Sequence, residues 1–140
     1  MLIYRLAIFF PALVMIVAGG ESGGFVPSNT SEIVDMHDPS RVCNSPIPVP
    51  VFGDVGGVVN NVPMVCGRNI INPNYTGSCY KFNTGDYTWT YSHEMITGRL
   101  GSASASFHDH LWVTGGYYKK STEFVTLSGS SPGPDLPSQR

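Results

Sequence analysis

Two histidines flank an acidic residue at His108-Asp109-His110, and imidazole and carboxylate groups are ordinary ligands of zinc. A zinc site needs three or four protein ligands at spacings that bring them together. No third ligand at a suitable spacing is evident near this trio. Polar residues of these types are also typical of tight turns. We therefore interpret residues 108–110 as a turn, and we expect neither a metal nor another cofactor.

Serines precede this trio at Ser102, Ser104 and Ser106, so the residue types of a catalytic triad occur within one short stretch. Close neighbours in sequence rarely supply the geometry of a triad. A nucleophile elbow also requires a helix after its strand, and no stretch of the chain has sustained helical periodicity. The alternation of serine with alanine instead indicates a narrow strand. We therefore expect no catalytic activity.

Three cysteines, Cys43, Cys66 and Cys79, leave one thiol unpaired if the others form a disulfide. Cys66 ends one predicted strand and Cys79 begins the next. Antiparallel pairing of these strands allows the two residues to face each other within disulfide reach. We predict a Cys66–Cys79 disulfide with Cys43 unpaired. A Cys43–Cys66 disulfide, or three free thiols, are the alternatives.

The elements that carry these residues have the pattern of repeated β-hairpins. Residues 99–116 contain small residues, a polar turn, an apolar strand and a closing glycine pair. A weaker copy occupies residues 56–68, and alignment of Cys66 with Thr114 gives an offset of 48 residues. Strands alternate with turns along the chain. A period of this length, built from four short strands, is typical of the blades of a β-propeller.

The spacing of particular residues resembles the kelch-repeat family. That family has an arginine before the first strand of a blade, a glycine pair after the second, and an aromatic pair on the third and fourth. Arg99 and Gly115-Gly116 match the first two features, and Phe82 and Trp89 match the aromatic pair, with phenylalanine in place of the family's usual tyrosine. The resemblance implies structural roles: glycines where backbones pass closely, rings buried between blades, and an arginine that bonds loop carbonyls between blades.

The resemblance covers residues 31–140 and implies an all-β fold. It departs from the family pattern at Gly67-Arg68, where a glycine pair is expected, and at Phe124, which no tryptophan follows. About two blades can be counted, whereas closed propellers have four or more. We therefore expect an incomplete kelch-type β-propeller, with further blades in the same full-length chain.

The first twenty residues have the pattern of a secretory signal peptide. Tyr4-Arg5 precede an apolar run at residues 6–18, and small residues follow. The run is short for a membrane span, and no stop-transfer pattern follows it. We predict cleavage near Gly20 and a secreted, extracellular protein without a stable membrane span. An uncleaved N-terminal membrane anchor is the alternative.

Composition and local motifs agree with this location. Asn29 and Asn74 begin Asn-X-Thr/Ser triplets and are predicted glycosylation sites. The formal net charge is −2 and no block of basic residues occurs, which argues against nucleic acid as a partner. Sixteen glycines and eleven prolines are spread along the chain, as expected for a β protein with many turns.

These observations predict the organisation of the chain and its function. The expected segments are a signal peptide at 1–20, a flexible lead-in at 21–30, the end of a blade with a proline-rich loop at 31–55, a kelch-like blade at 56–98, and a second, partial blade at 99–140. The expected function is that of a non-catalytic scaffold that binds an unknown protein partner. The alternatives are a fragment of a copper enzyme similar to galactose oxidase and a small disulfide-stabilised secreted β domain.

Overall fold

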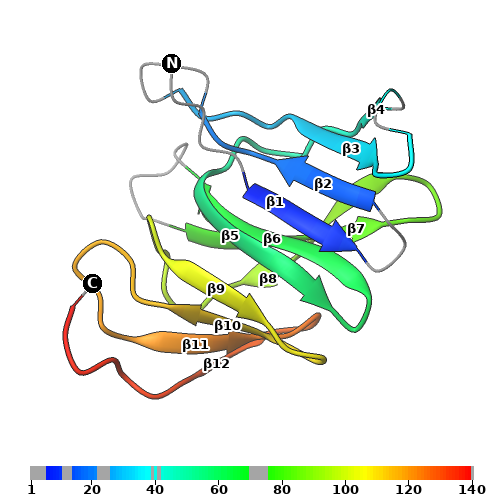
Figure 1. Ribbon diagram of the computed structural model, residues 1–140. Coiled ribbons are helices and arrows are strands. Elements are labelled where there is room, and N and C mark those ends of the chain that lie inside the picture. The colour runs from blue at the N-terminus through cyan, green and yellow to red at the C-terminus, as the bar shows by residue number, and fades with distance from the viewer. Residues whose placement is uncertain are drawn as a thin grey trace.

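The computed structural model describes residues 6–10, 14–21, 26–38, 40, 42–69 and 76–139. These residues form strands, turns and loops, and no helix occurs among them (Figure 1). The expectation of an all-β fold is confirmed. Since the described segments contain no helix, none of their elements qualifies as a helical membrane span.

The strands form three four-stranded antiparallel sheets. The first sheet contains β1 (Leu6–Phe10), β2 (Val14–Ala18), β3 (Ser31–Asp35) and β4 (Val42–Asn44). The second contains β5 (Phe52–Val59), β6 (Val62–Asn69), β7 (Thr76–Asn83) and β8 (Thr88–Glu94). The third contains β9 (Ala103–Ser106), β10 (Leu111–Thr114), β11 (Thr122–Val125) and β12 (Ser130–Pro132). Each strand pairs with the next one in the chain, so each sheet is a simple meander.

The β5–β6 hairpin shows how local sequence sets the register. Asn60 and Asn61 have φ angles of 47° and 62°. Two consecutive residues in the left-handed conformation form a type I′ turn. The twist of this turn matches the twist of the two strands that it joins, and asparagine tolerates the left-handed conformation. The turn places Val59 opposite Val62, as the sequence pattern predicts.

The first strands of the three sheets lie side by side, β1 beside β5 and β5 beside β9 (Figure 1). Side chains join β5 and β9: the Val58 amide donates to Ser106 Oγ at 2.9 Å, and Ser104 Oγ donates to the Gly56 carbonyl at 3.0 Å. A Cβ atom at Gly57 would clash with the Ser106 hydroxyl. The missing side chain therefore permits the close approach of β9.

Two apolar cores lie between the three sheets. Successive side chains of a strand point to opposite faces of its sheet, so one face of each strand can contribute its apolar side chains to a core. The core between the first and second sheets includes Ile16, Ile33, Val65, Phe82 and Trp89. The core between the second and third includes Val59, Met64, Leu111, Val113 and Val125. Sheet packing on both sides thus buries the second sheet.

The observed segments differ from the expected organisation at both ends. Residues 6–18, expected in a signal peptide, contribute β1 and β2 to the first sheet, where Ile16 and Ala18 are buried. Glu21 and Ser28, in the expected lead-in, make isolated bridges to Pro27 and Val51. An apolar run of this length suits two short strands as well as a signal sequence.

The second and third sheets also have other bounds than expected. The second sheet spans 52–94, so its first strand begins four residues before the predicted start at 56. The third sheet has all four strands, whereas residues 99–140 were expected to form a partial blade. Its last strand, β12, lies in a serine, glycine and proline segment that has little strand propensity.

Candidate functional site

The predicted disulfide is present. Cys66 on β6 lies directly opposite Cys79 on β7, with Cα atoms 4.0 Å apart, and both residues are fully buried. Cys43 on β4 is free and exposed. The disulfide therefore links the two central strands of the second sheet and is inaccessible to solvent. Its position indicates a structural role.

The aromatic pair Phe82 and Trp89 also lies between sheets. The two residues are opposite each other on β7 and β8, and their ring centroids are 5.0 Å apart. The Trp89 indole donates a hydrogen bond to Ser31 Oγ of the first sheet at 2.8 Å. This pair joins two sheets and presents no reactive group to solvent.

Arg99 precedes the third sheet and is buried with Glu123 of β11. Arg99 Nε lies 2.9 Å from Glu123 Oε1, and each side chain is only 1% exposed. The backbone amides of Ile96 and Thr97 also donate to this carboxylate, at 2.8 and 3.2 Å. The buried charges thus have an opposite charge and several hydrogen bonds, as such pairs require.

The remaining donors of Arg99 hold a loop. Nη1 donates to the carbonyls of Gly115 and Ser121 at 2.6 and 2.7 Å, and Nη2 donates to Ser121 Oγ at 3.0 Å. These acceptors belong to the two ends of residues 115–121, which connect β10 to β11 and which we name the tyrosine loop. Arg99 thus bonds loop carbonyls, but these belong to the third sheet itself and not to a contact between two blades, as the resemblance implied.

The tyrosine loop presents two aromatic side chains to solvent. Tyr117 and Tyr118 are 66% and 71% exposed, and their ring centroids are 4.2 Å apart. Their hydrogen bond raises the pKa of Tyr117. Tyr118 has a φ of 58°, a left-handed conformation that costs energy for a bulky residue.

Further hydrogen bonds fix the backbone beneath these rings. The Tyr117 amide donates to the Leu100 carbonyl at 2.8 Å, and the Lys119 amide donates to the Gly116 carbonyl at 2.9 Å. Gly116 has a φ of 106°, and a Cβ there would lie 3.2 Å from the Leu100 carbonyl oxygen. The glycine pair therefore lets the loop turn closely past the start of the sheet.

The C-terminal segment supports the same loop from the other side. Lys120 Nζ lies 3.3 Å from Asp135 Oδ2, and the Leu136 amide donates to the Lys120 carbonyl at 2.7 Å. Both charged side chains are more than half exposed, so the ion pair itself adds little stability. The backbone bond is the firmer of the two connections.

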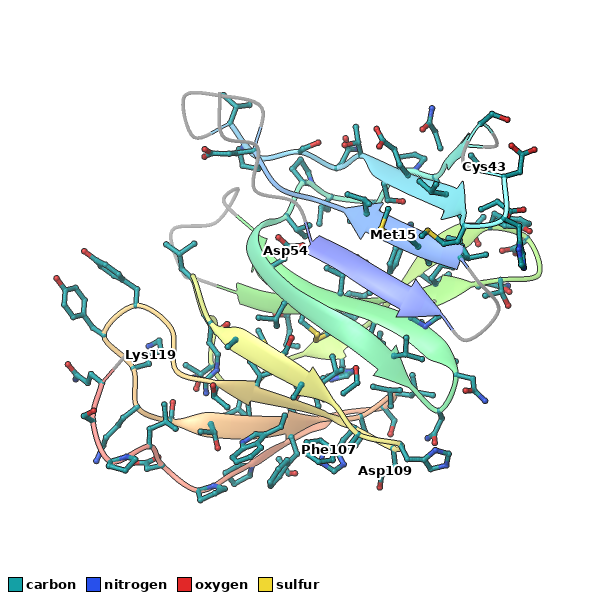
Figure 2. All side chains as sticks on the ribbon, in the orientation of Figure 1. Met15, Cys43, Asp54, Phe107, Asp109 and Lys119 are labelled. Carbon is teal, nitrogen blue, oxygen red and sulfur yellow. A yellow bond between two sulfur atoms is a disulfide. The ribbon has the colours of Figure 1, made fainter. Side chains whose placement is uncertain are left out.

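The His-Asp-His turn lies at the opposite end of the third sheet from the tyrosine loop, as the labels of Asp109 and Lys119 show (Figure 2). His110 Nδ1 is 2.7 Å from Asp109 Oδ1, and this hydrogen bond lowers the pKa of the exposed aspartate. The His110 ring stacks on Phe107. Within the described part of the chain, no three His, Cys, Asp or Glu residues gather as metal ligands would.

The serines beside that turn have structural partners or are enclosed. Ser104 and Ser106 bond the backbone of β5, as described above. The Ser102 hydroxyl is buried and forms no hydrogen bond. None of these three hydroxyls bonds a histidine in the described structure. Ser104 and Ser106 thus connect β9 to β5, and the described structure joins none of these serines to the nearby histidines.

His93 of β8 bridges the outer strands of the second and third sheets. Its Nδ1 is 3.0 Å from Ser92 Oγ, and its Nε2 is 3.3 Å from Ser130 Oγ. Ser92 Oγ donates to the Leu127 carbonyl at 2.8 Å. Burial lowers the pKa of His93. Among the described hydrogen bonds, hydroxyl groups and no carboxylate hold the imidazole, so the arrangement connects sheets.

Asp54 is a buried carboxyl group that the sequence pattern does not reveal. It follows Gly53, whose φ of 62° accompanies an irregularity of register in β5. Its Oδ2 atom is buried without a hydrogen-bond partner, close to Gly19, which follows β2. Figure 2 labels Asp54 near the start of β5. Burial raises the pKa of Asp54 to about 7.

The two predicted glycosylation sites differ in what the structure says of them. Asn29 is exposed in the segment before β3. Asn74 lies outside the described residues. The surface at Asn29 is therefore accessible to modification, and its use stays a prediction.

No known family model matches the chain, and no curated protein is significantly similar to it. The geometry of the tyrosine loop makes it the candidate site. It combines exposed aromatic rings, a strained residue and a buried clamp at its base.

Proposed function

We propose that this protein is a non-catalytic interaction scaffold of the secreted kelch-repeat type, and that the tyrosine loop contacts its protein partner. The observation that carries this proposal is the Arg99 clamp. One buried guanidinium bonds the carbonyls of Gly115 and Ser121 at the two ends of the loop that exposes Tyr117 and Tyr118.

The chemistry of the loop suits protein binding. Tyrosine offers a large contact area and a hydroxyl at low conformational cost, and it is enriched at binding hot spots. A loop fixed before binding also loses less entropy when a partner docks. The backbone bonds of Tyr117 and Lys119 supply that order in the unbound protein.

The arrangement of the sheets supports the propeller part of the proposal. Three consecutive meanders stack with their first strands together, an order that successive propeller blades share. Phe82 and Trp89 pack between two of them, as the kelch resemblance implies. We infer that each sheet corresponds to one blade, and that further blades complete the ring in a longer chain.

The Cys66–Cys79 disulfide supports an extracellular location, because such bonds persist in oxidising compartments. It equally favours the second candidate, a small secreted β domain that folds without further blades. A cooperative thermal melt of the 140-residue chain, followed by circular dichroism, is expected for that domain. Gradual loss of structure is expected for a fragment of an open ring.

Partner capture tests the role of the loop. Biotinylated wild-type protein, a Tyr117→Ser/Tyr118→Ser variant and a Tyr87→Ser/Tyr91→Ser control would be incubated with an extracellular fraction, and captured proteins quantified by mass spectrometry. Tyr87, in the turn before β8, and Tyr91, on β8, are about half exposed and lie away from the tyrosine loop in the sequence. We expect proteins that are retained by the wild type and the control and lost with the loop variant. Equal capture by all three proteins would reject the loop as the contact.

A further inference from the structure

A pocket of about 340 Å³ opens between the second and third sheets, where three turns come together. Asn61 lies in the turn between β5 and β6, Asn83 ends β7 before the turn to β8, and Leu127 follows β11. Leu127 is at the opposite end of β11 from the tyrosine loop. The pocket is therefore separate from the loop that we assign to a protein partner, and it lies on neither end face of the stack of sheets.

One wall of the pocket is apolar. Val62 of β6 is opposite Val59 of β5, and Val59 belongs to the core between the second and third sheets. Leu127 packs against that same core from the third sheet. Val62 and Leu127 are both half-buried and line the pocket. The core thus extends to the pocket as an apolar wall, and an apolar ligand group would be stabilised by covering it.

Hydrogen-bond donors line the rest of the pocket. Lys81 of β7 is opposite Met64 of the same core and opposite Thr90 of β8, so its side chain stands on the face towards the third sheet. Within the part of the chain that the structure describes, Lys81 has no ion pair. Asn83 Oδ1 accepts the Gly85 amide at 2.9 Å, which leaves the NH₂ group of Asn83 as a donor. The pocket therefore combines one unpaired ammonium with neutral donors.

These groups select the charge and size of a ligand. None of the described lining residues is acidic, and Lys81 is the one cation among them. A carboxylate carries one negative charge and accepts several hydrogen bonds, so it matches one ammonium beside amide and hydroxyl donors. A phosphate group carries roughly −1.5 to −2 charges at pH 7, which one ammonium does not balance. The volume is at the small end of the range of ligand pockets, which is ~300–1,000 Å³.

We propose that this pocket binds a small monocarboxylate, with the carboxylate at Lys81 and a short apolar chain against Val62 and Leu127. Both parts of the ligand are needed, because an exposed ammonium alone binds a simple anion weakly in water. The apolar wall adds the affinity that the ion pair lacks. The site needs neither the tyrosine loop nor a protein partner, and so this inference goes beyond the proposed scaffold function.

His93 of β8 can report whether the pocket is occupied. Burial lowers the pKa of His93, Glu94 and Glu123 raise it, and the positive charge of Lys81 lowers it. A carboxylate bound at Lys81 would offset that positive charge, so the pKa of His93 should rise when the ligand binds. The two glutamates are present in the free and the bound protein, and their effects therefore cancel in the comparison.

Titration of the nitrogen-15-labelled chain with sodium hexanoate at pH 7, followed by NMR, tests the proposal. We expect saturable shifts of the Lys81, Thr90 and Leu127 amides and a higher His93 pKa at saturation. Hexanol has the apolar chain without the charge, and inorganic phosphate has the charge without the chain. Each should bind at least ~10-fold more weakly than hexanoate. Shifts that do not saturate, phosphate binding as tight as that of hexanoate, or an unchanged His93 pKa would overturn the proposal.

Variants of the pocket test its two parts separately. Lys81→Gln removes the charge and should weaken hexanoate binding by ~10-fold or more, whereas Lys81→Arg keeps the charge and should retain binding. Val62→Thr keeps the shape of the wall and adds a hydroxyl, so it should weaken hexanoate binding more than acetate binding. Thermal melts check that each variant is folded.

Equal hexanoate binding by the wild type and by folded Lys81→Gln would show that the carboxylate does not lie at Lys81, and would overturn the proposal. The titrations contain no partner protein. A failure of the capture experiment with the tyrosine-loop variant would therefore leave their outcome unchanged, and the two proposals stand or fall separately.

Discussion

Arg99 and Glu123 form a buried ion pair that links the segment before the third sheet to its third strand, with Nε and Oε1 2.9 Å apart. The carboxylate also accepts two backbone amides, and the guanidinium also holds both ends of the tyrosine loop. Neither charge is accessible to water. The stability of the sheet and the shape of the loop therefore depend on the same two side chains.

Removal of one partner should destabilise the protein strongly. Glu123→Gln leaves the guanidinium buried without its counter-charge, and breaking such a pair typically costs ~3–5 kcal/mol. Urea unfolding monitored by tryptophan fluorescence measures this loss. Lys120→Gln, which removes one partner of the exposed Lys120–Asp135 pair, serves as the control and should change the unfolding free energy by less than ~1 kcal/mol. Similar effects of the two substitutions would contradict the role assigned to the buried pair.

The disulfide should stabilise the second sheet by constraining the unfolded chain. Cys66 and Cys79 are 13 residues apart, and closure of a loop of this size contributes ~3 kcal/mol. The Cys66→Ser/Cys79→Ser variant should therefore melt at a lower temperature than the wild type. Cys43→Ser is the matched control, since Cys43 is free and exposed. A lower melting temperature for the control variant alone would show that Cys43 forms a bond instead.

The buried carboxyl of Asp54 should make stability depend on pH. Its pKa is raised to about 7 in the folded protein, from 3.8, so the folded state holds a proton that the unfolded state releases. The contribution is full below pH 3.8 and is lost as the pH rises towards 7, by on the order of 4 kcal/mol in all. Asp54→Asn removes this dependence.

Unfolding free energies of the wild type and Asp54→Asn, measured from pH 4 to 8, isolate the effect. Groups common to both proteins, such as His93, cancel in the difference. We expect the variant to gain stability relative to the wild type as the pH rises. A constant difference across this range would show that Asp54 titrates normally.

The N-terminal strands make a further prediction about processing. Removal of residues 1–20 would delete β1 and β2 and expose Ile33 and Trp89, which the first core buries. A chain beginning at Glu21 should therefore melt at a lower temperature than the full chain. Removal of residues 137–140 is the control, because Ser138 and Gln139 are exposed. Equal stability of the full chain and of the chain without residues 1–20 would show that the first sheet is dispensable.

The features that local sequence determines were predictable. The Asn60-Asn61 turn favours a two-residue hairpin and sets the register of β5 on β6. Antiparallel pairing of the next two strands places Cys66 of β6 opposite Cys79 of β7. The short turn between β7 and β8 brings Phe82 opposite Trp89 in the same way.

The features that depend on distant partners were not predictable. The apolar residues 6–18 have the pattern of a signal sequence, and the burial of Ile16 and Ala18 depends on the second sheet, which lies far along the chain. Glu123 is a charged residue within a strand, and its structural role depends on its ion pair with Arg99, which lies before β9. An acidic side chain on the buried side of a predicted strand is the one signal that could have indicated a partner.

The serine hydroxyls between β9 and β5 have a consequence for how the chain avoids misassembly. β5 is an edge strand of the second sheet. The backbone groups on its open side could pair with a strand of another chain, as exposed sheet edges do. The Val58 amide donates to the Ser106 hydroxyl, and the Ser104 hydroxyl donates to the Gly56 carbonyl. Neither backbone group is therefore available to a strand of another chain. The second and third sheets thereby stay separate layers and do not merge into one wide sheet.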